Sequence, residues 1–328
     1  MIDLITMPLF VIIIIFLAAL FVLIKSADFF TDAAEDIGLA LGIPQFIVGV
    51  TIVSVGTSLP ELASSLISVT RGASEFVVGN VVGSNIANIL LVLGIAAIVA
   101  KKMKMDFDLV KVDLPLLLGS SFLLGALIYF APFSGQVKMF TLFSGILCIV
   151  GYVIYVMYAV SHHEKEKKKK HPFKWKSVGI LLIGAVFIYL GAEFVIDSVI
   201  AGGTQLGVST SVIALSAVAL GTSLPELTVS IQAVRKKKYE VAVGNALGSN
   251  IFNTFIVMGI PAMFGSLVIP MSIITFALPF MIGATLLFII SIMDKEISRY
   301  EGLMFVLFYI VFIWKLFTFL QMQQKILV

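Results

Sequence analysis

The chain has 328 residues, of which 60% are Ala, Val, Ile, Leu, Met, Phe, Trp, Tyr or Cys and only 12% are charged. So few charged side chains cannot cover a soluble domain of this size, because its surface would be one exposed apolar patch. The single cysteine, Cys148, excludes an internal disulfide and a thiolate-rich metal site. The three histidines all flank one lysine run outside the apolar segments, which argues against zinc or haem chemistry inside a membrane.

The apolar segments have the length of membrane spans. A transmembrane helix needs roughly 20 mostly apolar residues to cross about 30 Å of hydrocarbon. Ten segments qualify: 6–26, 41–70, 75–99, 112–131, 137–160, 177–200, 207–234, 240–264, 268–292 and 302–320. The first has no basic n-region and is too long for a signal peptide, so we expect it to be retained as a helix. The sequence predicts an all-α polytopic membrane protein with ten transmembrane helices.

The basic residues predict the orientation of these helices. Most of the 22 lysines and arginines lie at the end of the first segment, where Lys25 stands, or in the loops after the third, fifth, seventh and ninth segments. The exceptions are Arg71, Lys138, Lys315 and Lys325. Because positive residues accumulate in cytoplasmic loops, we expect these loops to be cytoplasmic and both termini extracytoplasmic, in the plasma membrane. The net charge of +3 then reports topology and not a nucleic-acid partner. The lysine run at 162–176 is interpreted as a solvated connector, with a lipid-headgroup or regulatory contact as the alternative.

The chain repeats itself at an offset of 165 residues. Residues 56–62 and 221–227 both read GTSLPEL, while residues 79–88 read GNVVGSNIAN and residues 244–253 read GNALGSNIFN. We therefore predict two five-helix repeats, 1–161 and 177–328, joined by the linker 162–176. Because five is odd, the second repeat has the opposite orientation, and such inverted repeats share a site near the membrane midplane.

The first motif lies in the middle of the second and seventh segments. Pro60 and Pro225 lack a backbone N–H and clash with the carbonyl four residues earlier. We expect both helices to be broken there, with free carbonyl oxygens that need a partner at a depth without bulk water.

The same motif gathers oxygen ligands. Glu61 follows Thr57 by four residues and Ser58 by three, which places all three on one helix face. A glutamate at mid-membrane costs roughly 2.5–3.5 kcal/mol, and two facing one axis also repel each other. No basic residue lies in the four motif-bearing segments, so a cation site is favoured over a carboxylate that only joins helices. The candidates from both copies are Thr57, Ser58, Glu61, Thr222, Ser223 and Glu226.

The second motif adds a polar stripe at every fourth residue. Asn80, Ser84 and Asn88 form it in the first copy, and Asn245, Ser249 and Asn253 form it in the second. Ser84, Asn88, Ser249 and Asn253 are candidate ligands. Gly79 and Gly83 are interpreted as close-packing points between helices. Asn85 and Asn250 fall off the stripe.

This set of ligands contains only oxygen atoms, which suits hard cations. Ca²⁺ takes six to eight oxygen ligands, whereas softer metals call for Cys, Met or His. Two carboxylates supply a charge of −2, which one Ca²⁺ or two Na⁺ would neutralise.

At these motifs the chain resembles the cation/calcium exchanger superfamily, specifically its Na⁺/Ca²⁺ exchangers without a cytoplasmic regulatory domain. The resemblance implies that Glu61 and Glu226 bind Ca²⁺ and Na⁺ in competition. It also implies hydroxyl ligands from the Thr and Ser before each glutamate, carbonyl ligands at Ser54 and Ala219, and Na⁺ ligands at Ser84 and Ser249. The transported ions are then Ca²⁺ and Na⁺, with no cofactor, no obligate protein partner and no enzymatic activity.

Two departures, at three positions, distinguish this chain from branches of that superfamily. Ca²⁺/H⁺ members carry an acid at the positions of Ser84 and Ser249, which favours Na⁺ over protons here. Many Na⁺/Ca²⁺ and K⁺-dependent relatives carry an aspartate at the position of Asn253, so its absence disfavours coupling to K⁺ and leaves the ion stoichiometry open. A Ca²⁺/H⁺ or other cation/proton antiporter remains the alternative. A channel suits mirrored broken helices less well, and an intramembrane hydrolase would lack a base for Ser58 or Ser223.

Overall fold

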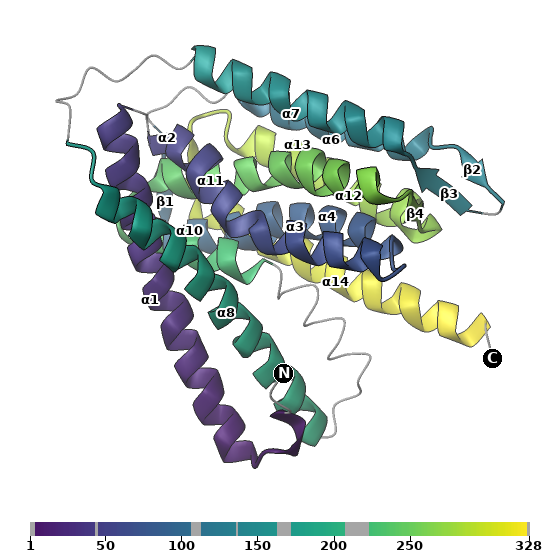
Figure 1. Cartoon of the computed structure of the whole chain (residues 1–328), viewed down its shortest axis with the longest axis horizontal. Coiled ribbons are helices and arrows are strands. Elements are labelled where there is room, and N and C mark those ends of the chain that lie inside the picture. The colour runs from purple at the N-terminus through teal and green to yellow at the C-terminus, as the bar shows by residue number, and fades with distance from the viewer. Residues whose placement is uncertain are drawn as a thin grey trace.

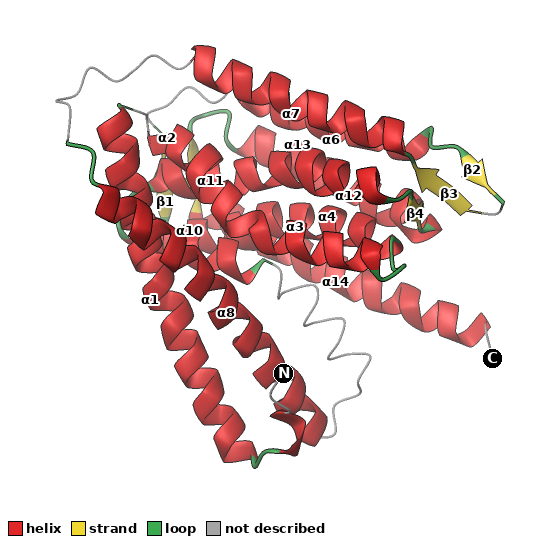
Figure 2. Cartoon of the chain, in the orientation of Figure 1, coloured by secondary structure: helices red, strands yellow, loops and turns green. Residues whose placement is uncertain are grey.

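The computed structural model describes residues 4–42, 45–105, 113–135, 137–162, 172–206 and 223–326, and nearly all of them are helical (Figures 1 and 2). The first half contains a short 3₁₀ turn (Leu4–Thr6), α1 (Leu9–Leu41), α2 (Gln45–Val48), α3 (Ser54–Thr70), α4 (Glu75–Ala87), α5 (Gly94–Ala100), α6 (Asp113–Tyr129) and α7 (Leu142–His162). The second half contains α8 (Trp175–Gln205), α10 (Leu224–Arg235), α11 (Tyr239–Phe252), α12 (Met258–Phe264), α13 (Leu278–Ser291) and α14 (Arg299–Ile326).

Four stretches of π-helix connect some of these helices end to end. They are η2 (Gly49–Val53), η3 (Asn88–Leu93), η4 (Asn253–Val257) and η5 (Ile273–Ala277). Helix runs 45–70, 75–100, 239–264 and 273–291 are thus each continuous through a wider turn. Within the described residues, seven helices are long and apolar enough to cross a membrane, and α6 supplies a shorter apolar helix. The molecule is a polytopic helical membrane protein.

The two helices that carry the second motif form the centre of the bundle. In run 75–100, 83% of the most apolar window is buried, and in run 239–264 the fraction is 78%, against 17% in α1. Large apolar side chains such as Phe10, Leu17 and Phe21 are instead exposed along α1. In Figure 1, α1 and α8 lie side by side and are inclined away from the remaining helices, and their contact is extensive. Apolar side chains therefore face outward and polar motifs face inward, as expected in a bilayer.

Two small antiparallel sheets join loops at opposite ends of the bundle (Figure 2). β1 (Lys102–Lys104) pairs with β5 (Glu296–Ser298), and Lys102 forms an ion pair with Glu296. β3 (Val137–Phe140) lies between β2 (Phe133–Ser134) and β4 (Leu267–Ile269). The sequence did not predict these strands, and β3 and β4 take up the start of the predicted spans 137–160 and 268–292.

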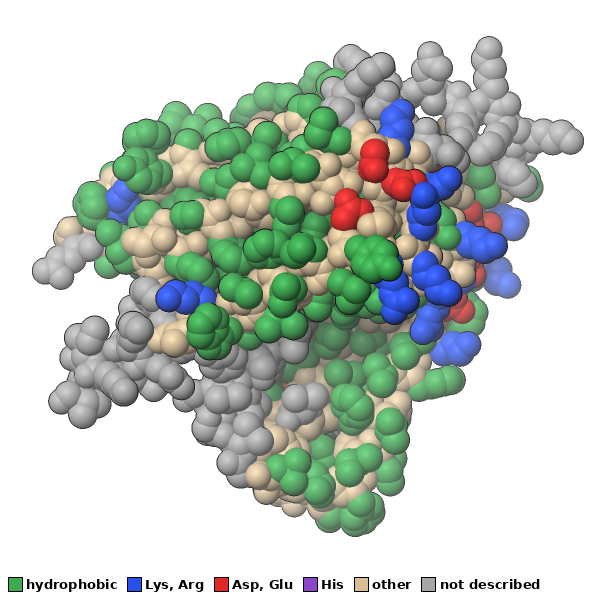
Figure 3. Space-filling model, turned by 180° about the vertical axis from the view of Figure 1, so that it is seen from behind, with side chains coloured by type: hydrophobic (Ala, Val, Ile, Leu, Met, Phe, Trp, Pro, Cys, Tyr) green, Lys and Arg blue, Asp and Glu red, His purple; other side chains and the backbone are tan. Residues whose placement is uncertain are grey.

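The basic side chains gather at one end of the molecule, while apolar side chains cover its flanks (Figure 3). The acidic C-terminal part of α1 meets basic loops there: Lys236 pairs with Asp28 and Asp32, and Lys238 pairs with Asp32 and Glu35. These contacts correct the predicted first span. The helix does not end at Lys25 but continues to Leu41, because its acids are neutralised by lysines of other loops.

The predicted break at Pro60 is also wrong. Pro60 lies inside α3, and the irregular backbone is η2, about two to three turns earlier. Side-chain hydroxyls accompany the wider turn: Thr51 Oγ1 donates to the Ile47 carbonyl at 2.6 Å, and Ser54 Oγ donates to the Val50 carbonyl. In the other half, Pro225 lies in the first turn of α10, where a missing N–H costs nothing, and residues 207–222 lie outside the described part.

The glycines of the second motif differ between the halves. A Cβ at Gly244 would lie 2.5 Å from the Phe46 carbonyl oxygen, so α11 packs backbone to backbone against α2 and η2. For Gly79 and Gly83, by contrast, a Cβ would meet no heavy atom within 4 Å among the described residues. Their predicted packing role is therefore not seen there, because the mirror images of α2 and η2 fall in the undescribed stretch.

Candidate functional site

Both motif glutamates are buried in the centre of the bundle. Glu61, on α3, is 1% exposed, and Glu226, in the first turn of α10, is fully buried. Neither Glu61 carboxylate oxygen has a hydrogen-bond partner, and Glu226 Oε2 has none either. Among the described residues, no lysine or arginine forms an ion pair with these carboxylates. Unpaired buried carboxylates are strongly destabilising, so the arrangement requires positive charge from elsewhere.

Hydroxyls of the first half reach groups of the second half. Ser58 Oγ donates to Glu226 Oε1 at 3.0 Å. Thr57 Oγ1 lies 3.1 Å from Asn245 Oδ1 and 3.2 Å from the Ser54 carbonyl oxygen. The GTSLPE motif of one half is therefore in direct contact with polar residues of the other.

The second motif is tied to the first by mirrored hydrogen bonds. Asn80 Nδ2 donates to Ser65 Oγ at 3.2 Å and to the Glu61 carbonyl at 3.5 Å. Asn245 Nδ2 donates to Ser230 Oγ at 3.0 Å and to the Glu226 carbonyl at 3.4 Å. Each bond in one half has its counterpart 165 residues later, so the two motif pairs are built alike.

The remaining candidates that can be placed are also buried. Ser84, Asn88, Ser249, Asn253 and Ser223 are each at most 3% exposed. Asn88 and Asn253 are the first residues of η3 and η4, so each stands where its helix widens. The atoms Ser223 Oγ, Ser249 Oγ, Asn88 Oδ1 and both amide atoms of Asn253 have no hydrogen-bond partner. Thr222 and Ala219 lie outside the described residues.

Sequence reasoning set aside Asn85 and Asn250, and the structure places both at the contact between α4 and α11. Asn85 Nδ2 donates to the Asn250 carbonyl at 3.3 Å, and Asn250 Nδ2 donates to the Asn85 carbonyl at 3.1 Å. The sequence signal for these two residues was that both repeats have asparagine at this position, 165 residues apart. Periodicity within one helix did not reveal their role, because both lie off the polar stripe and face the partner helix.

A cavity of about 350 Å³ lies between α3 and α8 and reaches both motif prolines. Its polar lining comes from Ser64 and Ser68 on α3 and from Tyr189 and Glu193 on α8. The Tyr189 hydroxyl donates to Glu193 at 3.3 Å. Pro60 and Pro225 each precede a site glutamate in the sequence, and both prolines line this cavity.

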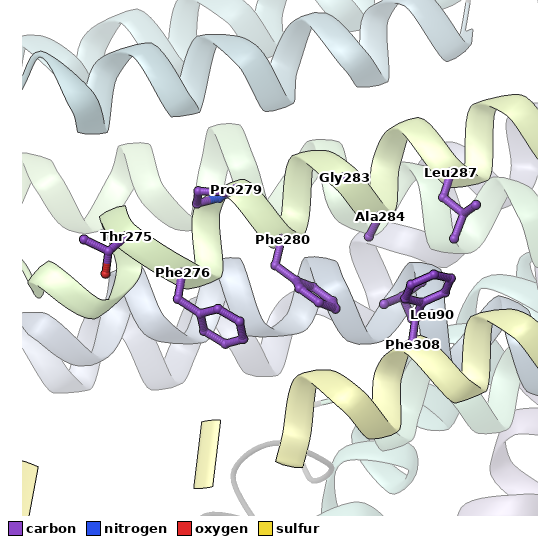
Figure 4. A pocket seen from close by; sticks show the side chains of 9 residues that line it. All are labelled: Leu90, Thr275, Phe276, Pro279, Phe280, Gly283, Ala284, Leu287 and Phe308. Atoms are coloured by element: carbon purple, nitrogen blue, oxygen red, sulfur yellow. The ribbon is translucent and has the colours of Figure 1, made fainter. Parts of the chain in front are cut away.

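A second cavity, of about 520 Å³, is of a different kind (Figure 4). Phe276 and Phe280 enter it from η5 and α13, with Phe308 of α14 and Leu90 of η3. Its one hydroxyl, on Thr275, donates to the Met271 carbonyl. With no charged lining group, this cavity does not suit a cation.

The geometry defines a class of protein. A bundle with an apolar exterior encloses two unpaired carboxylates, hydroxyls and amide oxygens, and the described residues hold no group of three or more His, Cys, Asp or Glu placed to hold a metal ion. Hard cations are bound by such oxygen sets, and intramembrane acids of this kind mark ion pathways. The fold and the site are those of a cation transport protein.

The chain belongs to the sodium/calcium exchanger family. The family model described as sodium/calcium exchanger protein matches residues 11–161 and 176–318. The chain is 32% identical to the sodium/calcium exchanger MaX1 of Methanosarcina acetivorans, over 92% of this chain and 97% of that protein. It is 34% identical to the inner membrane protein YrbG of Escherichia coli, over 75% and 78%. A structure of the sodium-calcium exchanger NCX_Mj, soaked with zero Na⁺ and Ca²⁺, matches with a TM-score of 0.81 and 28% identity, covering 94% of this chain and all of that one. MaX1 and NCX_Mj are named as exchangers, that is, as transport proteins and not as enzymes.

Proposed function

We propose that this protein exchanges Na⁺ for Ca²⁺ across the membrane, with both ions competing for one site around Glu61 and Glu226. The observation that carries the proposal is that three of the four carboxylate oxygens are buried without a partner. One Ca²⁺ would neutralise the two carboxylates and be coordinated by their unpaired oxygens. The hydroxyls of Thr57, Ser58 and Ser223 and the Asn88 amide oxygen add neutral ligands.

Sodium is the proposed counter-ion. Ser84 and Ser249 supply neutral oxygens where an acid would favour proton exchange, and MaX1 and NCX_Mj are named as sodium/calcium exchangers. A cation/proton antiporter is the second candidate, because buried carboxylates also bind protons. The putative antiporter CaxA of Alkalimonas amylolytica, 30% identical over 92% of this chain, keeps that candidate in view.

Alternating access is the proposed mechanism, and two mirrored interfaces support it. At the basic end, Ala27 of α1 and Val229 and Ala233 of α10 are fully buried, and ion pairs close the edge. At the other end, the mirror positions on α8 and α3 border the 350 Å³ cavity. The interface is thus tightly packed at one end and bordered by a cavity at the other, which supports access to the proposed site from that second end.

The repeats and the orientation belong to the same proposal. Two inverted repeats, 1–161 and 177–328, would exchange the roles of these interfaces during transport. The basic end would face the cytoplasm and both termini the exterior of the cell, with the bilayer as the surrounding partner. A turnover of three Na⁺ for one Ca²⁺ would move one net charge, whereas two for one would move none.

Reconstitution tests the function directly. Proteoliposomes loaded with Na⁺ and diluted into Na⁺-free buffer should take up Ca²⁺, and an imposed K⁺ or H⁺ gradient should not replace the Na⁺ gradient. Uptake driven equally well by a pH gradient without Na⁺ would contradict the proposal and support the proton antiporter. The response of uptake to an imposed membrane potential decides between the two stoichiometries.

A further inference from the structure

The amides of Asn85 and Asn250 have fixed orientations. They are 1% and 2% exposed, and the amide nitrogen of each donates to the backbone carbonyl of the other. A carbonyl oxygen only accepts hydrogen bonds, so the group facing it must be the NH₂ and not the amide oxygen. The carbonyl that each amide faces therefore fixes the direction in which that amide points.

The orientation of Asn250 determines that of Asn88. Asn250 Oδ1 faces Asn88 Nδ2 at 3.1 Å, and an oxygen can accept only from a donor, so Asn88 must turn its NH₂ toward Asn250. Asn88 Oδ1 then points away from Asn250, where it is buried with no partner. A buried carbonyl oxygen without a hydrogen-bond partner is destabilising, so the Asn88 oxygen is available to coordinate a cation.

We infer that Asn250 is a positioning residue that turns the oxygen of Asn88 toward the transported cation. This rests on the proposed function. If the Asn88 amide were reversed, it would present N–H groups to a positive ion and repel it. Asn250 therefore acts through Asn88, as the outer partners of metal ligands commonly do.

The mirrored half lacks the equivalent bond. By symmetry Asn253 Nδ2 would donate to Asn85 Oδ1, yet both atoms are without partners. Asn85 Nδ2 also donates to Thr254 Oγ1 at 3.0 Å, and the position that mirrors Thr254 is Ile89, which has no hydroxyl. One of two otherwise equivalent asparagines is thus oriented for cation binding in this structure, and the other is not.

The test compares two variants by direct Ca²⁺ binding to the purified full-length protein, with exchange in proteoliposomes measured alongside. Asn250→Ala removes the acceptor that orients Asn88 and should weaken Ca²⁺ binding about tenfold or more. The matched control, Asn85→Ala, deletes the same kind of bond between α4 and α11 but leaves Asn250 and Asn88 in place, so binding should weaken less than about threefold. Equal losses in the two variants would overturn the inference.

A change of background separates orientation from structure. In Asn88→Asp, both ends of the side chain are oxygen, so orientation no longer matters and Asn250→Ala should then cause less than about a twofold loss. A tenfold loss in both backgrounds would mean that Asn250 acts only through folding. If Asn250→Ala does not fold, Asn250→Leu, of similar volume, serves in the same comparison. Wild-type protein that binds no Ca²⁺ would instead refute the proposed function.

Discussion

The interface between α1 and α10, at the basic end of the molecule, differs in packing from its counterpart between α8 and α3 at the other end. Gln232 of α10, at the basic end, is 7% exposed, whereas its mirror residue on α3, Ile67, is 49% exposed. Asp28 of α1 pairs with Lys236 at 2.5 Å, whereas its mirror residue on α8, Glu193, is exposed at the cavity. One end is closed and the other is open, although the helices that form them are related by the repeat.

The difference follows from charge as well as from burial. Partial burial lowers the pKa of Lys236, but its hydrogen bonds and ion pairs to Asp28 and Asp32 outweigh this effect and raise the pKa above its usual value. The lysine therefore stays charged at neutral pH. At the other end Arg71 mirrors Lys236, and the described residues give it no ion-pair partner. The interface between these helices is thus more completely buried at the end where charges also pair across it.

The largest effect on Ca²⁺ exchange is expected from the two buried carboxylates, Glu61 and Glu226. Glu61→Gln or Glu226→Gln should lower Ca²⁺ exchange at least about 100-fold, since loss of one buried charge costs about 3 kcal/mol or more. Glu193→Gln is the matched control, because that acid lines the cavity and is exposed. Ca²⁺ uptake into proteoliposomes should survive in the control alone. Uptake near the wild-type rate in either site variant would sink the assignment.

A smaller effect is expected from the ion pairs that close the basic end. Lys236→Ala with Lys238→Ala removes four ion pairs to Asp28, Asp32 and Glu35 and should favour opening there by about 1 kcal/mol, or roughly fivefold. The reporters are cysteines at the mirrored positions Gln232 and Ile67, each in a Cys148→Ala background.

In the protein with its lysines, a thiol reagent should label the cysteine at position 67 much faster than the one at 232. The lysine substitutions should raise labelling at 232 and lower it at 67. Labelling rates that do not change at either position would mean that the ion pairs do not hold this end closed.

The smallest effect is expected from a single neutral ligand. Thr57→Val removes one hydroxyl that bonds to the Ser54 carbonyl and to Asn245. The substitution should weaken the binding of both Ca²⁺ and Na⁺ by about fivefold. Thr51→Val is the control, because the Thr51 hydroxyl, in η2, donates only to the Ile47 carbonyl of α2. If Thr57→Val reduces only the yield of protein, with both affinities unchanged, this threonine is structural.

Much of the fold follows from the apolar pattern, and the errors have local causes. The predicted spans 75–99, 112–131 and 240–264 match helix runs 75–100, 113–129 and 239–264, because an apolar run of that length has few other solutions in a bilayer. The first span was ended too early, since its later acids look like loop residues until their lysine partners are known. Proline predicts a lost hydrogen bond but not where the helix relaxes, which was at η2.

The site was predicted less completely than the fold. The burial of Glu61 and Glu226 follows from their place in apolar segments, and their meeting follows from the repeat. The contact of Asn250 with Asn88 could not be predicted, because helical periodicity gives the face of a residue but not the point at which two helices meet. Each amide direction depends on a carbonyl of the other half.

If one site around Glu61 and Glu226 serves both ions, Ca²⁺ must displace bound Na⁺, which equilibrium binding of radioactive Na⁺ can measure. Purified protein is equilibrated with labelled Na⁺, and Ca²⁺ is then raised to saturation. We expect bound Na⁺ to be lost, and the Ca²⁺ concentration needed to rise with the Na⁺ concentration. Bound Na⁺ that remains when Ca²⁺ is saturating would show that the two ions occupy separate sites.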